Sequence, residues 1–387
     1  MKKILLIEDD QLVAHIYRNK FLTENYEVEI AFDGEAGFEV ANTFHPDVVI
    51  LDLMLPKVSG LDLLKKIRAQ EDLKHIPVIV FSNTFLSNMV QEAWKAGATK
   101  CLSKANCTPK QVLEVVRNLL LPPPAAAVAA SVETDADTAF QSELRRTFLA
   151  SLPATIAACR SHLQAVAKTT DEPTRVKSLE ELYRRIRTLT GNAGIAGVLP
   201  IAQMADALEA LLKEVYEKPK NINASTLRTV ASAIDFLGLL SERTTMTNAP
   251  GDQAQLKAQI LVVDDEAISR RAVTYALEKA KLTSVSVENP EVALGMLGEN
   301  IYDLVFLDVD MPGMNGFELC TKLRALARNK TTPVIFVTSL TDFESRANST
   351  MSGGNDLIAK PFLFMELAVK ALVYILRNRL NATAPKP

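Results

Sequence analysis

Several features typical of membrane or secreted proteins are missing from this sequence. No apolar stretch reaches eighteen residues, and the longest apolar run, residues 119–130, contains three consecutive prolines that a membrane-spanning helix would not tolerate. The apolar run at residues 4–7 is followed at once by three acidic residues, so it is too short for a signal peptide. We therefore expect no membrane partner and no targeting segment.

Cysteines are few, and positive charge is not in excess. The four cysteines show no CxxC spacing and no nearby histidine cluster, which argues against a zinc site or a disulfide framework and favours the reducing cytoplasm. The formal net charge is −3, whereas a nucleic-acid-binding surface normally needs a basic face, so we expect no direct nucleic-acid partner. The length of 387 residues suffices for two or three domains.

What the chain does contain is an internal repeat. Residues 4–10 (ILLIEDD) resemble residues 260–266 (ILVVDDE), and residues 48–52 (VVILD) resemble residues 304–308 (LVFLD). The offset is 256 positions for four matching pairs, which are Glu8 and Asp264, Asp52 and Asp308, Ser82 and Thr338, and Lys104 and Lys360. A constant offset without insertions indicates a duplicated domain.

Each copy alternates short, continuous apolar runs with longer amphipathic segments. In the first copy the pattern predicts strands near residues 3–8, 27–31, 47–52, 77–82 and 99–103, and a last helix near 109–120. Continuous apolar runs are typical of parallel strands that are buried on both faces. We therefore predict two doubly wound α/β domains, each with a flavodoxin-like five-stranded parallel sheet that binds ligands at the carboxyl ends of its strands.

The segment between the copies has a different character. Residues 140–243 show helical periodicity and no strand signal, which predicts an all-α antiparallel bundle. Four prolines are expected at turns, first turns or breaks of these helices, namely Pro153, Pro173, Pro200 and Pro219. The predicted domains are residues 1–121, 140–243 and 258–381, joined by a Pro/Ala-rich linker at 122–139 and a second linker at 244–257.

Each copy places a set of polar groups at the ends of its predicted strands. An acidic pair follows the first strand, an aspartate the third, a hydroxyl residue the fourth and a lysine the fifth. A carboxylate can attack phosphorus, and Mg²⁺ together with a lysine can neutralise the phosphoryl charge. Any one of these residues means little alone. Their combination at identical spacing in both copies favours a site that accepts a phosphoryl group.

In this combination each copy resembles the receiver domain of bacterial two-component response regulators. The proline four residues and the glycine eight residues after the aspartate fit the same pattern (Pro56 and Gly60, Pro312 and Gly316). The resemblance implies that Asp52 and Asp308 are phosphoacceptors. It implies Mg²⁺ ligands at Glu8, Asp9, Asp52 and the Met54 carbonyl, and at Asp264, Asp265, Asp308 and the Asp310 carbonyl. It also implies switch hydroxyls at Ser82 and Thr338, and phosphoryl contacts from Lys104 and Lys360.

The two copies depart from the family pattern in different ways. Lys104 precedes Ala105 rather than proline, and a cis bond there would cost about 3–4 kcal/mol, so we expect a trans or shifted bond. Asn83 follows the switch serine where the family has a small residue, and its bulk would narrow access to Asp52. We therefore expect the first copy to be phosphorylated more slowly than the second. Cys101 and Leu357 replace the usual switch aromatic in the two copies.

The middle segment resembles a histidine phosphotransfer (HPt) domain at residues 186–194 (IRTLTGNAG). Arg187 stands at the histidine position, and arginine stays protonated, so it is not a plausible phosphoryl carrier. Gly191 lies on the same helix face, where the family leaves room for a docking receiver. Two interpretations stay open, a solvated basic helix face or an HPt-like domain without its histidine that docks an acidic site. His162 lies outside the motif and is expected at the surface.

The leading interpretation is a cytoplasmic response regulator in a phosphorelay. A sensor histidine kinase or a phosphotransfer protein would supply the phosphoryl group, and output would pass to a downstream signalling protein through protein contacts. We expect a signalling phosphoacceptor rather than an enzyme, which could still phosphorylate itself from small donors and dephosphorylate itself. The alternatives are a phosphorelay shuttle whose bundle carries phosphate on a histidine, and a scaffold whose receivers are not phosphorylated.

Overall fold

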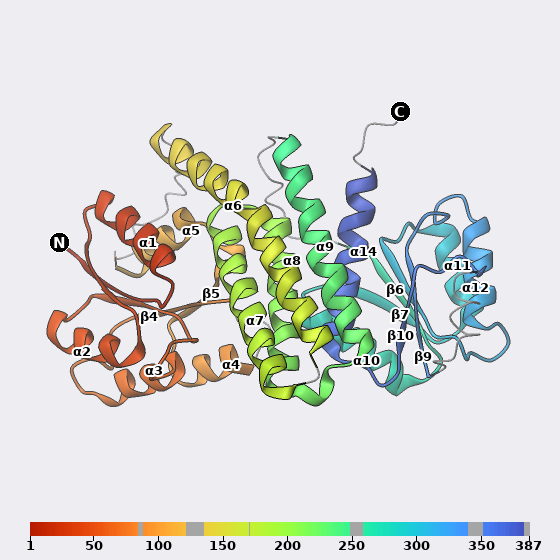
Figure 1. Cartoon of the computed structure of the whole chain (residues 1–387), viewed down its shortest axis with the longest axis horizontal. Helices are drawn as coiled ribbons and strands as arrows, with labels where there is room; N and C mark the ends of the chain where they lie inside the picture. The colour runs from red at the N-terminus through yellow and green to blue at the C-terminus, as the bar shows by residue number, and fades with distance from the viewer. Residues whose placement is uncertain (84–87, 121–134, 170, 248–257, 340–350, 383–387) are drawn as a thin grey trace. The chain divides into compact units, whose positions relative to one another are not determined.

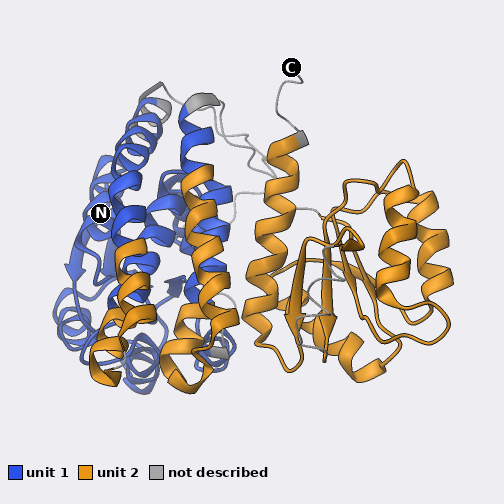
Figure 2. Ribbon diagram, turned by 45° about the vertical axis from the view of Figure 1, so that its right-hand side comes forward, with its two compact units in different colours: residues 1–159, 181–210, 240–252 blue, residues 160–180, 211–239, 253–387 orange. Residues whose placement is uncertain are grey.

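The computed structural model describes residues 1–83, 88–120, 135–169, 171–247, 258–339 and 351–382 (Figure 1). The chain divides into two compact units (Figure 2). Unit 1 comprises residues 1–159, 181–210 and 240–252, and unit 2 comprises residues 160–180, 211–239 and 253–387. Each unit therefore contains one copy of the repeat together with parts of the middle segment.

Unit 1 is built on a five-stranded parallel sheet in the order β2-β1-β3-β4-β5. The strands are β1 (Lys3–Ile7), β2 (Glu27–Ala31), β3 (Val48–Leu51), β4 (Val78–Ser82) and β5 (Lys100–Ser103). The helices are α1 (Gln11–Thr23), α2 (Gly34–Phe44), α3 (Gly60–Ala69), α4 (Asn88–Lys95), the 3₁₀ turn η1 (Lys104–Asn106) and α5 (Pro109–Leu120). The predicted α/β fold of the first copy is confirmed, with strand limits within about one residue of those expected.

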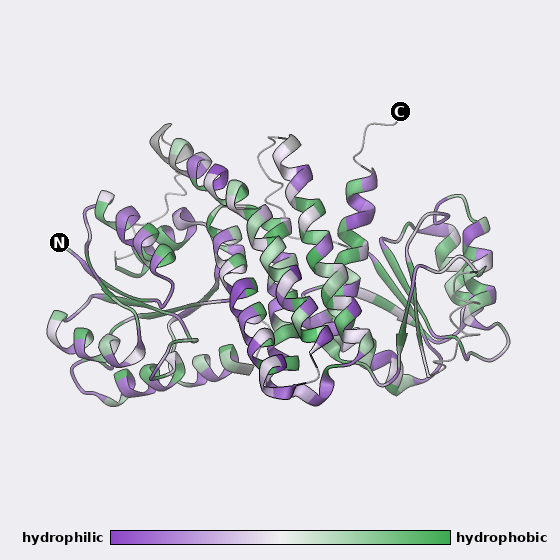
Figure 3. Ribbon diagram, in the orientation of Figure 1, coloured by the Kyte–Doolittle hydropathy of each residue, from purple (hydrophilic) through white to green (hydrophobic). Residues whose placement is uncertain are grey.

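Helices cover both faces of this sheet, as the unbroken apolar strands require. Buried side chains of α2, α3 and α4 pack on one face, for example Ala41, Leu63 and Ala93. Buried side chains of α1 and α5 pack on the other face, for example Phe21 and Val116. The strands are mainly in the colour of apolar residues in Figure 3. The polar strand ends are therefore the part of the sheet that remains for chemistry.

Unit 2 repeats this architecture, with the strand order β10-β9-β8-β6-β7. The strands are β6 (Ile260–Val263), β7 (Ser284–Val287), β8 (Leu304–Leu307), β9 (Val334–Thr338) and β10 (Asp356–Ala359). The described helices are α10 (Ala267–Lys279), α11 (Pro290–Glu299), α12 (Gly316–Ala325) and α14 (Phe364–Ala382). Counted from the first strand of each copy, the order is 2-1-3-4-5 in both sheets, the flavodoxin-like arrangement.

The middle segment is helical, as predicted. It forms α6 (Asp135–Lys168), α7 (Glu172–Ile195), α8 (Leu199–Glu217), the 3₁₀ turn η2 (Pro219–Asn221) and α9 (Ala224–Thr247). Helix α6 begins within the expected linker 122–139, where acidic residues favour a helix start, and α9 ends within the expected linker 244–257. The rest of both linkers, residues 121–134 and 248–257, lies outside the described residues. None of the described helices has the length and apolar character needed to cross a membrane.

One proline expectation is wrong. Pro173, Pro200 and Pro219 lie in the first turn of a helix or 3₁₀ turn, where the missing N–H is not needed. Pro153, in contrast, lies inside the 34-residue helix α6. The buried face of this helix continues from Leu152 across the proline to Ile156 and Cys159. Packing of that face therefore outweighs the local cost of losing one helical hydrogen bond.

The glycine eight residues after Asp52 and the one eight residues after Asp308 allow a close backbone approach, and this gives a test of the fold. A Cβ atom at Gly316 would lie 2.1 Å from the Asp308 carbonyl oxygen, whereas a Cβ atom at Gly295 in α11 would meet nothing within 4 Å. We expect Gly316→Ala to destabilise unit 2 by about 1–3 kcal/mol through overpacking. Gly295→Ala should be neutral or stabilising by up to about 1 kcal/mol. Urea-dependent hydrogen exchange of β8 measures both, and equal effects of the two variants would contradict the prediction.

Candidate functional site

The parallel sheets bring the predicted site residues together at the carboxyl ends of their strands. In the first copy, Glu8 and Asp9 follow β1, Asp52 follows β3, Ser82 ends β4 and Lys104 follows β5. In the second copy the same positions hold Asp264, Asp265, Asp308, Thr338 and Lys360. Since consecutive loops leave the sheet at the same edge, residues about 100 positions apart in sequence become neighbours.

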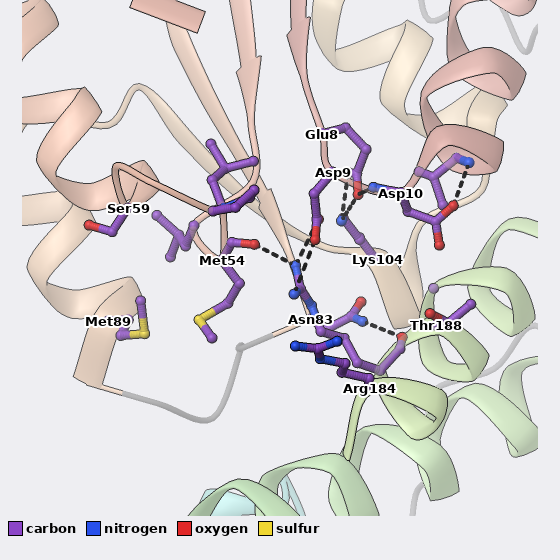
Figure 4. A pocket seen from close by; sticks show the side chains of 16 residues that line it. Glu8, Asp9, Asp10, Met54, Ser59, Asn83, Met89, Lys104, Arg184 and Thr188 are labelled. Carbon is purple, nitrogen blue, oxygen red and sulfur yellow. Dashed lines mark hydrogen bonds and ion pairs between the residues drawn. The ribbon is translucent and has the colours of Figure 1, made fainter. Parts of the chain in front are cut away.

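Lys104 lies at the centre of the first site. Its Nζ atom is 2.6 Å from Glu8 Oε2 and 2.7 Å from Asp52 Oδ2. All three side chains are almost fully buried. The Met54 backbone N–H donates to Asp52 Oδ1 at 3.0 Å. Glu8, Asp9 and Lys104 line a pocket of about 620 Å³. Figure 4 shows Lys104 directed toward Glu8.

A second cation enters the first site from helix α7. The Arg187 Nη2 atom donates to Asp52 Oδ2 at 2.9 Å, to Asp9 Oδ1 at 3.0 Å and to the Met54 carbonyl oxygen at 2.7 Å. The Arg187 side chain is only 20% exposed to solvent. The interpretation of this helix face as a solvated basic surface is therefore wrong for Arg187, which contacts the acidic site of the first copy within unit 1.

The two cations determine the ionisation of the first site. Burial alone would raise the pKa of Asp52, but Lys104 and then Arg187 outweigh burial and hold this pKa at about 2. Burial raises the pKa of Glu8 above its ordinary value, and Lys104 opposes that rise. The pKa of Arg187 is raised because Asp52 and Asp9 outweigh its own burial. Asp52 is therefore a stable carboxylate, with two positive groups against it.

The second site has the same plan, with Lys360 as the cation that contacts its acidic side chains, while Arg270 donates to the backbone carbonyl of Asp264 at 2.6 Å. Lys360 Nζ lies 3.0 Å from Asp264 Oδ2 and 3.1 Å from Asp308 Oδ1. Asp264 is fixed further by the Ser269 hydroxyl, which donates to its Oδ2 at 2.5 Å. Asp265 is exposed, so one side of the site faces solvent. Among the residues that the structure describes, no arginine forms an ion pair with the three carboxylates.

The pKa of Asp308 reflects the smaller positive charge that contacts the acids of the second site. Burial raises the pKa of Asp308 above its ordinary value, and Asp264 adds to the rise, while Lys360 opposes it. Asp52 and Asp308 thus shift in opposite directions although they occupy equivalent positions. The arginine beside Asp52, which has no counterpart in the described part of the second site, contributes to this difference.

Both sites contain carboxylates close enough to hold one cation. Oxygen atoms of Glu8, Asp9 and Asp52 lie within 4.8 Å of one another, and so do those of the second group, Asp264, Asp265 and Asp308. Carboxylate and carbonyl oxygens are the ligands that Mg²⁺ prefers. The second group, with its exposed Asp265, fits such an ion. The first group fits it only if Arg187 leaves, because the guanidinium contacts the same oxygen atoms.

The comparisons with known proteins agree with this geometry. The model of the response regulator receiver domain matches residues 4–117 and 260–372, which together make more than half of the chain. The chain belongs to the response regulator receiver family. Such receivers act in two-component phosphorelay signalling and interact with histidine kinases or other signalling proteins.

Individual relatives cover one receiver at a time. The transcriptional regulatory protein ResD of Bacillus subtilis is 39% identical over 119 residues, which is 30% of this chain and 48% of ResD, so the match spans about half of that relative. The polar-differentiation response regulator DivK of Brucella ovis is 28% identical over 119 residues, 31% of this chain and 96% of DivK. A solved structure, the BeF3-activated DrrB receiver domain, is 27% identical, with a TM-score of 0.29, and covers 32% of this chain and 100% of that chain.

Helix α7 contacts the first receiver through more than Arg187. The Asn83 side-chain amide donates to the Arg187 backbone carbonyl at 2.9 Å. A Cβ atom at Gly194 would lie 1.8 Å from the Lys104 carbonyl oxygen, whereas one at Gly191 would meet nothing within 4 Å. Ile195 belongs to the apolar cluster between the receiver sheet and α1 and α5. The glycine that allows close docking is therefore Gly194 rather than Gly191.

Two of these roles do not follow from the sequence. The bulk of Asn83 predicts crowding of Asp52, whereas in the structure its side-chain amide holds the backbone of α7. The sequence signal for this role is a large polar residue, Asn83, at a position where the family has a small residue. Gly194 gave no signal of its own, because nothing local shows which glycine of α7 meets the receiver. Among the described residues the cis peptide bond is Lys360–Pro361, in agreement with the trans bond expected after Lys104.

Glu209 in α8 gives a pH-dependent prediction. Its carboxylate is buried, its Oε2 atom has no partner among the described residues, and burial raises its pKa from 4.5 to about 7. The folded chain therefore binds more protons than the unfolded chain between these values, so stability falls as pH rises from about 4.5 to about 7. We expect Glu209→Gln to stabilise unit 1 by about 1–3 kcal/mol at pH 8 and much less at pH 4.5.

Thermal unfolding at the two pH values checks this. The exposed Glu217→Gln makes the same chemical change outside the buried core and provides the control. An equal effect of Glu209→Gln at both pH values would contradict the prediction.

Proposed function

We propose that this chain is a phosphorelay response regulator that accepts phosphoryl groups on Asp308 and on Asp52 with Mg²⁺. The supporting observation is the duplicated set of an acidic pair, an aspartate, a hydroxyl residue and a lysine at one edge of each sheet. Membership of the receiver family supports the same chemistry. The second receiver is the better prepared acceptor, because Lys360 alone forms ion pairs with its acids among the residues that the structure describes.

In the second receiver, an Asp308 carboxylate oxygen attacks the phosphorus atom of the donor. A new oxygen–phosphorus bond forms, and the bond from phosphorus to the leaving group breaks, so that the leaving group takes the electron pair. Lys360, 3.1 Å from Asp308, supplies positive charge to the transferred oxygens, and the Thr338 hydroxyl would hydrogen-bond one of them. Asp264, Asp265 and Asp308 with the Asp310 carbonyl would hold Mg²⁺, whose charge offsets that of the phosphoryl oxygens.

In the first receiver, Asp52 would act in the same way, with Lys104 and Ser82 as its partners. Glu8, Asp9, Asp52 and the Met54 carbonyl would hold the metal when Arg187 is withdrawn. The middle segment would be an HPt-like domain without phosphoacceptor function, because Arg187 stands at the histidine position. Its docking against the acids of the first receiver supports this assignment.

Partners follow from this proposal. A sensor histidine kinase or a phosphotransfer protein would donate the phosphoryl group, and a downstream signalling protein would receive the signal through protein contacts. The protein would act in the cytoplasm, which its four free cysteines support. It would be a phosphoacceptor rather than an enzyme, with self-phosphorylation from small donors. The shuttle and the unphosphorylated scaffold remain the alternatives that the following two experiments distinguish.

The first experiment measures the intact mass of the full chain after treatment with acetyl phosphate and Mg²⁺. We expect Asp308→Asn to remove the faster-forming phosphoryl adduct, because no arginine of the described chain contacts the wild-type carboxylate. Asp52→Asn should remove the slower adduct, and the double variant should gain no mass. Asp72→Asn, a change at an exposed carboxylate outside both sites, is the control. A phosphorylated double variant would overturn the assignment, and unlabelled wild-type protein would favour the scaffold.

The second experiment tests whether the helical segment carries phosphate. Acyl phosphates are lost in base, whereas phosphohistidine survives base and is lost in acid. We expect all label on the phosphorylated full chain to be lost in base, because the protonated guanidinium of Arg187 is a poor nucleophile toward phosphorus. Base-stable label on His162 would support the shuttle instead, and His162→Gln identifies it by loss of that label.

A further inference from the structure

The oxygen atoms that Arg187 contacts in the first receiver are those expected to hold the metal. Its Nη2 atom lies 3.0 Å from Asp9, 2.9 Å from Asp52 and 2.7 Å from the Met54 carbonyl. This set contains two carboxylates and one backbone carbonyl from two different loops. A guanidinium carries a permanent positive charge and donates hydrogen bonds in several directions. It can therefore bind oxygen atoms that would otherwise coordinate a metal ion.

The position of Arg187 is fixed by the docking of its helix rather than by its own flexible side chain. Asn83 holds the backbone carbonyl of Arg187, Gly194 lies against the Lys104 carbonyl, and Ile195 is 98% buried in the apolar cluster. Gln141 of α6 donates to the Ile195 carbonyl at 2.8 Å and fixes the end of α7. These contacts are independent of the ion pair, so they hold the guanidinium in place.

Arg187 and a divalent ion cannot occupy the site together. Mg²⁺ binds oxygen at about 2.0–2.1 Å and requires near-octahedral geometry. An ion at this distance from Asp52 Oδ2 and from the Met54 carbonyl would overlap the space of the Arg187 Nη2 atom. The two positive charges would also repel each other at a buried position where screening is weak.

We propose that the Arg187 guanidinium takes the place of the divalent cation in the first receiver. While α7 is docked, Arg187 keeps this site closed to metal and to phosphate. This proposal rests on the metal assignment of the proposed function. Metal binding and docking of α7 then compete, and linkage makes the competition reciprocal. Any partner that pulls α7 away increases the metal affinity of the first receiver, and any partner that holds α7 decreases it.

The test is calorimetric titration of the full chain with MgCl₂. Asp264→Asn and Asp308→Asn are present in every sample so that only the first receiver can bind. We expect Arg187→Ala to bind Mg²⁺ at least about tenfold more tightly than the parent. Arg187→Lys should be intermediate, because one ammonium group cannot reproduce the planar fork.

Two glycine variants separate docking from the charge of the arginine. Gly194→Ala keeps every ligand and Arg187, but its Cβ atom would meet the Lys104 carbonyl oxygen at 1.8 Å, so it should loosen α7 and tighten Mg²⁺ binding as Arg187→Ala does. Gly191→Ala makes the same chemical change in the same helix without a steric contact and should leave Mg²⁺ affinity unchanged. Equal effects of the two glycine variants would overturn the docking argument.

The outcomes distinguish this proposal from the proposed function. If Asp52→Asn abolishes Mg²⁺ binding but Arg187→Ala does not change the affinity, the metal site stands and the substitute-cation proposal is overturned. If the first receiver binds no Mg²⁺ in any variant, the metal assignment itself is wrong. Hydrogen exchange of the unmutated chain adds a readout that needs no arginine variant. Mg²⁺ should increase exchange in residues 184–195, and unchanged exchange under saturating Mg²⁺ would also overturn the proposal.

Discussion

Buried carboxylates at the edge of a parallel sheet require a nearby positive charge, and the local structure of both receivers follows from this requirement. Glu8 and Asp52 are almost completely shielded from water, and an uncompensated charge in such a place costs several kcal/mol. In the first receiver the compensation comes from Lys104 and Arg187. In the second receiver Lys360 contacts two acids, while Asp265 stays in water. The two solutions leave different room for a metal and a phosphoryl group.

Duplication therefore did not produce two equivalent sites. The repeat preserves each chemical group at a constant offset, yet Asp52 and Asp308 have pKa values shifted in opposite directions. One cause lies outside the repeat, in Arg187 of helix α7, which contacts Asp9 and Asp52.

The docking of α7 also shows how small residues decide which surfaces meet. Gly194 brings the helix backbone against Lys104, and Asn83 joins the receiver loop to the carbonyl of Arg187. A larger residue at position 194 would remove the close approach to Lys104, and a small residue at position 83 would remove the hydrogen bond to the Arg187 carbonyl. The charged contact thus depends on steric and backbone contacts that carry no charge. This dependence makes the arrangement specific to unit 1.

The sequence by itself determined the duplicated α/β fold, the strand positions, the helical middle segment and the grouping of acids, hydroxyl and lysine in each copy. These features are encoded by short-range periodicity and by a topology that places all strand ends at one edge. Only the tertiary structure decided that Arg187 enters the first site, that Gly194 rather than Gly191 makes the close contact, and that α6 continues through Pro153. Arg187 and Asp52 are 135 positions apart, and no local pattern records which helix face packs against which loop. Such choices depend on the summed packing of many residues, which a linear pattern does not contain.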